Sequence, residues 1–99
     1  MLTSENIPQT LYYGTTSLKL DSIWENGNTI TLNNYLTMTD DISVATKRAL
    51  AEAKNDGSNP LLLENSNLKG IIEGSGINEV MRYRVNPGQE YKIRGIDYL

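Results

Sequence analysis

The chain has 99 residues, a formal net charge of −3 and neither cysteine nor histidine. This length allows one small domain with a modest core. The missing residue types exclude disulfides, thiolate zinc sites and serine–histidine or cysteine–histidine catalysis. A pI near 4.8 argues against a general nucleic-acid binder, because neutralising phosphates needs a basic surface. No apolar run approaches membrane-span length and the first ten residues do not resemble a signal peptide, so we expect a cytoplasmic protein.

The first predicted element is a short apolar strand that breaks at Gly14. Because glycine has no Cβ, a planar group can approach this backbone closely, and its N–H and C=O can bind an amide or a phosphate. Residues 15–17 are good N-cap residues, and apolar residues at helical spacing follow up to Trp24. The helix should end in the segment 25–28, which contains a C′ glycine. The local order is therefore strand, glycine, helix.

The middle of the chain predicts two strands and a second helix. A turn at 33–34 precedes a short strand at 35–37. Residues 39–41 should cap an alanine-rich helix from about 42 to 54. A breaker-rich loop separates this helix from a buried strand at 61–63.

The last third predicts strands with an antiparallel hairpin. A short strand at 71–72 precedes a flexible turn at 73–76. The segment 78–85 alternates with a period of two, which places Glu79 at the entrance of a strand. A tight turn at 86–88 then leads into a final strand at 89–96.

The order of these motifs resembles the ADP-ribosyltransferase-like fold of poly(ADP-ribose) polymerases, many bacterial toxins and NAD-dependent RNA phosphotransferases. Leu-Tyr-Tyr-Gly-Thr at 11–15 is similar to the family's Leu-Tyr-His-Gly-Thr strand. Tyr-Leu-Thr at 35–37, with the alanine-bearing helix after it, looks like the second motif. Leu-Leu-Leu-Glu at 61–64 is similar to the central strand, and the segment 78–93 resembles the closing hairpin with its catalytic glutamate.

This resemblance implies one α+β domain over residues 1–99, with two small, mainly antiparallel sheets around an NAD cleft and two helices. Gly14 would bind the nicotinamide amide, with Thr15 beside it. Tyr13 stands where the family has a histidine or arginine that grips a ribose or phosphate. Tyr35 would pack against nicotinamide. Glu79 would stabilise the oxocarbenium-like state in which the nicotinamide–ribose bond breaks.

The preferred hypothesis is an NAD-using mono-ADP-ribosyltransferase that needs no metal and modifies a protein or nucleic-acid target, with a size that suits a phage or bacterial effector. The alternative is an inactive domain of the same fold that serves as a binding, inhibitor or antitoxin module. RNA 2′-phosphotransfer is a third hypothesis. Each site residue also has a structural reading: Tyr13 and Tyr35 as packed rings, Gly14 as a turn residue, and Glu79 as a solvated side chain.

Overall fold

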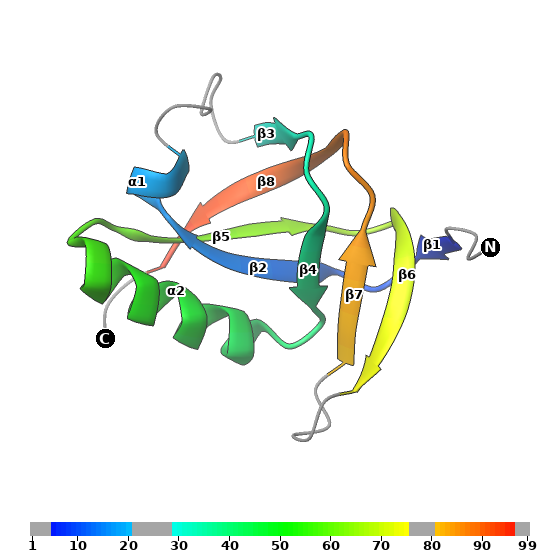
Figure 1. The fold of residues 1–99 in the computed structure, drawn as a ribbon, viewed down its shortest axis with the longest axis horizontal. Helices are drawn as coiled ribbons and strands as arrows, with labels where there is room; N and C mark the ends of the chain where they lie inside the picture. The colour runs from blue at the N-terminus through cyan, green and yellow to red at the C-terminus, as the bar shows by residue number, and fades with distance from the viewer. Residues whose placement is uncertain (1–4, 21–28, 76–80, 97–99) are drawn as a thin grey trace.

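In the computed structural model, which describes residues 5–20, 29–75 and 81–96, the chain forms a small mixed α/β domain (Figure 1). Its described strands make one curled antiparallel sheet of eight strands in the order β1-β6-β7-β4-β2-β5-β8-β3. The strands are β1 (Glu5–Ile7), β2 (Leu11–Thr16), β3 (Thr29–Leu32), β4 (Leu36–Thr39), β5 (Pro60–Asn65), β6 (Leu68–Ser75), β7 (Met81–Val85) and β8 (Gln89–Gly95). The helices are α1 (Ser17–Leu20) and α2 (Ile42–Asp56).

The sheet has two arms that meet at one residue pair. The first arm contains β3, β8, β5 and β2, and the second contains β4, β7, β6 and β1. In Figure 1 the strands of the second arm run across those of the first. The arms are joined where Tyr12 of β2 pairs with Thr39 of β4. The sequence predicted two sheets, whereas the described strands form one sheet whose two halves share this single connection.

One apolar core links the two arms. All eight strands and α1 contribute side chains to it, because the inward residues of each strand alternate with exposed ones. Tyr13 and Leu36 are partly buried and pack against its margin. The buried members are Ile7, Leu11, Leu20, Ile30, Leu32, Met38, Leu61, Leu63, Leu68, Tyr83, Val85, Tyr91 and Ile93.

The helix α2 lies on the opposite face of the first arm. Its Asp41 N-cap accepts a hydrogen bond from the Ser43 backbone N–H at 2.9 Å, and Gly57 ends it in the left-handed conformation with φ 73°. The predicted helix is therefore confirmed, with two further residues at its end. Its buried residues are all alanines, which allows the helix backbone to approach the sheet closely: Ala45, Ala49 and Ala53.

A hydrogen-bonded carboxylate fixes the end of α2 to the end of β2. The buried Thr16 hydroxyl donates to Asp56 Oδ2 at 2.7 Å, and the Ser58 hydroxyl donates to Asp56 Oδ1 at 2.6 Å. These two hydrogen bonds, that of Ser58 first, lower the pKa of Asp56 because they favour its charged form. The contact holds the helix in one position along β2.

The predicted hairpin of the two last strands is wrong. β7 pairs with β4 and β6, while β8 pairs with β5 and β3, so the turn between them carries the chain from the second arm to the first. The Gly88 N–H donates to the Leu32 carbonyl at 2.7 Å, which fixes that crossing. A tight turn is compatible with both arrangements. Only the strand partners distinguish them.

Two further expectations differ from the structure. β2 continues through Gly14 to Thr16, because both neighbours of Gly14 pair with β5. Residues 73–75, predicted as a turn, belong to β6, which pairs with β7 across a bulge between Ile72 and Gly74. β1 and β3 were not predicted. Most of the first predicted helix, residues 21–28, lies outside the described residues, and α1 is the described part.

The core contains one hydroxyl without a hydrogen-bond partner in the described part of the chain. Tyr91 is 0% exposed, and burial raises the pKa of its phenol to about 12. Tyr83 is also buried, but its hydroxyl donates to Asp40 Oδ2 at 3.1 Å. The two tyrosines can be compared directly, because the hydroxyl of Tyr83 has a hydrogen-bond partner and the hydroxyl of Tyr91 has none among the described residues.

We expect Tyr91→Phe to raise the free energy of unfolding by about 1 kcal/mol at pH 7, because it removes an unsatisfied buried donor. Tyr83→Phe should lower it by about 1 kcal/mol, because it breaks a hydrogen bond. The folded pKa of Tyr91 is raised, so the parent should also lose stability as pH rises from 10 to 12, and Tyr91→Phe should lose less. Urea titrations at pH 7 and across that window measure both effects. Equal alkaline losses in parent and Tyr91→Phe would contradict this assignment.

Candidate functional site

The alternation of hydrogen-bonded and non-hydrogen-bonded residue pairs between β2 and β5 shows where the peptide groups of Gly14 point. Beyond the end of β2, the Ser17 N–H donates to the Asn59 carbonyl at 2.9 Å, so these two residues form a hydrogen-bonded pair. Such pairs alternate along an antiparallel ladder. In the continuous register of β2 and β5, Thr15 and Tyr13 are therefore bonded to β5, and Gly14 is not. The N–H and C=O of Gly14 point away from β5.

That other edge of β2 carries no strand at Gly14 among the described residues. β4 occupies the edge only at Tyr12, which pairs with Thr39, and then diverges as part of the second arm. The main-chain donor and acceptor of Gly14 thus face a gap in strand pairing. We call this stretch of β2, from Tyr13 to Thr16, the strand-free edge. The peptide groups of Gly14 face this edge, and they are the groups for which the sequence predicted a ligand amide.

The reason for glycine at this position differs from the prediction. A Cβ on Gly14 would lie 2.2 Å from the Ala45 carbonyl oxygen and 2.8 Å from the Ala49 nitrogen, both in the backbone of α2. The face without a side chain is therefore filled by the helix and is closed to a planar ligand. Gly14 is buried. Close packing of strand and helix requires this glycine, and the ligand hypothesis now concerns only its strand-free edge.

Arg48 of α2 reaches the strand-free edge from the helix side. Its guanidinium carbon lies 5.3 Å from the centre of the Tyr13 ring. Tyr13 and Gly14 point to opposite faces of β2, and α2 covers the face of Gly14. Because β5 occupies one edge of β2, the Arg48 side chain must pass around the other edge of this strand. The tyrosine ring and the guanidinium form a cation–π contact.

The remaining predicted site residues lie in different surroundings. Thr15 is buried on the core face and pairs with Leu61. Tyr35 precedes β4 and is 64% exposed. Tyr35 is four residues from Thr39, where the arms meet. In an extended chain this separation is about 13 Å. The structure thus brings Tyr13, Gly14 and Arg48 together, and Tyr35 is separate from them.

Glu79 lies outside the described residues. The described strand β7 begins two positions later, at Met81. β7 is the neighbour of β4, the strand that meets β2. The relation of the Glu79 carboxylate to the strand-free edge stays a prediction.

Arg48 was not among the residues that the sequence assigned to the site. A signal for its position was available, because it immediately precedes the buried Ala49 and follows Ala45 by three residues. Such a residue flanks the buried stripe of a helix, and a long side chain there can reach past the edge of the strand beneath it. What the sequence did not provide was the divergence of β4.

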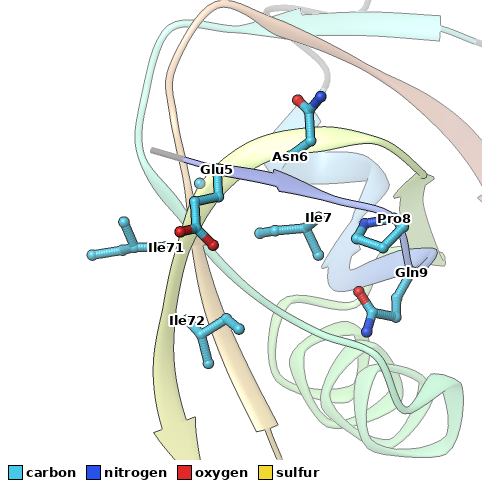
Figure 2. Close-up of a pocket in the computed structure, with 8 residues that line it drawn as sticks. Glu5, Asn6, Ile7, Pro8, Gln9, Ile71 and Ile72 are labelled. Carbon is cyan, nitrogen blue, oxygen red and sulfur yellow. The ribbon is translucent and has the colours of Figure 1, made fainter. Parts of the chain in front are cut away.

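A separate hollow of about 390 Å³ lies at the margin of the second arm, between β1 and β6 (Figure 2). Glu5, Ile7 and Ile72 contribute side chains to its lining. In the sheet order, β7 and β4 separate this margin from β2. The described lining of the hollow contains none of Tyr13, Gly14, Thr15 and Tyr35.

Within residues 5–20, 29–75 and 81–96, no group of three acidic, cysteine or histidine side chains is placed to hold a metal ion. None of the helices in the same ranges is both long enough and apolar enough to cross a membrane.

Comparisons with known proteins return no match: no family model, no curated protein and no solved structure is similar to this chain at a significant level.

We expect Gly14→Ala to destabilise the protein by about 3 kcal/mol or more, because the added methyl group overlaps helix backbone that cannot rotate away. Gly95→Ala is the matched control, since a Cβ there meets nothing within 4 Å and the glycine also lies in a strand. Chemical unfolding of the two variants gives the comparison. Similar midpoints for both would mean that α2 does not pack against Gly14 as described.

Amide hydrogen exchange tests which residues of β2 are hydrogen-bonded to β5. The amide of Gly14 should exchange at least about tenfold faster than those of Tyr13 and Thr15, because only the latter two are bonded to β5. Exchange measured by NMR under native conditions resolves the three neighbours. Equal protection of all three amides would show that the edge at Gly14 is occupied.

Proposed function

We propose that this protein is an NAD-using mono-ADP-ribosyltransferase. The observation that carries the proposal is the strand-free edge of β2, where the N–H and C=O of Gly14 have no strand partner among the described residues. A nicotinamide amide offers one donor group and one acceptor, so it can pair with these two peptide groups as a neighbouring strand would. The order of the sequence motifs gives independent support.

Tyr13 extends this binding edge. Its ring is half-buried against the core, and its phenol can hydrogen-bond a ribose hydroxyl. Tyr35, which precedes β4 and is 64% exposed, is the proposed stacking partner of the nicotinamide. The divergence of β4 from β2 supports a ligand bound along the strand-free edge.

Glu79 is the proposed catalytic residue. The bond between ribose C1′ and the nicotinamide nitrogen breaks with its electron pair leaving on nicotinamide, and C1′ becomes an oxocarbenium-like centre. A carboxylate that binds the ribose hydroxyl and faces this centre stabilises the positive charge. A nucleophilic group of a protein or nucleic-acid target then bonds to C1′ and loses its proton.

The assay uses labelled NAD with cell lysate as the source of acceptor. The parent protein should release nicotinamide and label a macromolecule, and Glu79→Gln should lower the rate about 100-fold or more while leaving NAD binding largely unchanged. Glu90→Gln is the matched control, because Glu90 is an exposed glutamate on β8. The proposal fails if the parent yields neither labelled product nor nicotinamide, or if Glu79→Gln behaves like the parent.

The burial of Gly14 favours a second candidate function, a binding or inhibitor module of the same fold. A residue with so little exposed surface gives a ligand access only after the side chains around it move. Calorimetry separates the two functions, since a ligand-binding remnant binds NAD without turnover. A module that only contacts a partner protein gives no heat with NAD.

A further inference from the structure

We propose that Arg48 binds the phosphate groups of the dinucleotide, and so supplies from α2 the positive charge that residue 13 lacks. This inference rests on the proposed function, because it names a ligand contact of the same site. It starts from one geometric fact, the position of the Arg48 guanidinium 5.3 Å from the centre of the Tyr13 ring.

The contact with the Tyr13 ring does not use up the hydrogen-bonding capacity of Arg48. A guanidinium has five N–H donors in a planar fork that matches phosphate oxygens in pairs. Three other basic side chains have carboxylate partners, Lys19 with Glu52, Arg84 with Glu73 and Arg94 with Glu64. Arg48 is exposed and has no such partner among residues 5–20, 29–75 and 81–96. Its charge is available to an anion.

The path of the side chain places this charge at the strand-free edge of β2. Arg48 comes from the helix on one face of β2 and meets the Tyr13 ring on the other, so it passes along the strand-free edge. A ligand held by Gly14 and the Tyr13 hydroxyl would contact it. The Tyr13 ring also restricts the guanidinium, which reduces the conformational freedom that binding would otherwise remove.

The charge of the ligand requires such a group. A dinucleotide carries a negatively charged diphosphate, and the net charge of this chain is −3, so long-range electrostatics oppose its binding. The Tyr13 phenol can donate a hydrogen bond but contributes no positive charge. Arg48 is a cation at this edge. It offsets the repulsion between the acidic chain and the diphosphate and supplies the positive charge that Tyr13 does not carry.

The test compares ligands with and without phosphates on three variants. Calorimetry with NAD, inorganic pyrophosphate and nicotinamide riboside is run on the parent, Arg48→Ala and Arg48→Lys. We expect Arg48→Ala to weaken binding of NAD and pyrophosphate at least about tenfold and to leave nicotinamide riboside within about twofold, as loss of a charged hydrogen bond predicts. Arg48→Lys should recover part of the NAD affinity, because it keeps the charge and loses the paired donors.

Lys54→Ala is the matched control, since it removes the same charge from an exposed position further along α2. It should bind all three ligands as the parent does, and urea titrations verify that every variant folds. Equal NAD affinity in the parent and Arg48→Ala overturns the role of Arg48 and leaves the proposed function intact. Loss of nicotinamide riboside binding to the same extent also overturns it, because the effect is then structural.

Two further results separate this inference from the proposed function. If the parent binds pyrophosphate through Arg48 but does not bind NAD, the anion site stands and the proposed function fails. If the parent binds none of the three ligands, both fail.

Discussion

The fold depends on the close contact between the backbone of β2 and that of α2 at Gly14. A side chain at this position would overlap helix main-chain atoms, and the facing helix residues Ala45 and Ala49 are as small as a helix allows. At the end of the same strand, Thr16 is hydrogen-bonded to Asp56. The backbone contact at Gly14 sets the distance between α2 and β2, and the hydrogen bond between Thr16 and Asp56 fixes the position of the helix along the strand. Every residue that α2 presents to the edge of β2 takes its position from this packing.

A second constraint is the single residue pair that joins the arms. With only Tyr12 and Thr39 bonded, β4 leaves β2 immediately and runs into the second arm, where it pairs along its length with β7. Unpaired main-chain groups in a sheet are costly unless another group binds them. The same divergence that curls the sheet around one core therefore creates the edge at Gly14. Architecture and candidate site have a common cause.

Local signals in the sequence predicted the elements better than their partners. The capped α2 and the buried strand β5 follow from capping residues and apolar runs, and both are present. The predicted hairpin of β7 and β8 is wrong, because a turn specifies a change of direction and not which strand lies alongside. At Gly14 the residue was singled out correctly, but its reason is packing against a helix 31 residues later in the chain. Such contacts between distant segments leave no local pattern.

The same limit applies to chemistry inferred from motifs. A pattern assigns a role to a position, so a tyrosine where a basic residue is expected suggests a missing function. In three dimensions the positive charge beside Tyr13 comes from another element, because Arg48 lies over its ring. A phenol at residue 13 is then suited to its place: its face holds the guanidinium, and its hydroxyl remains free to bind a ligand. The pair can offer a cation and a hydrogen bond, which a single histidine or arginine would have to combine. Whether a residue type is missing from a site is decided by the side chains that reach the site, and not by the one position where a motif expects it.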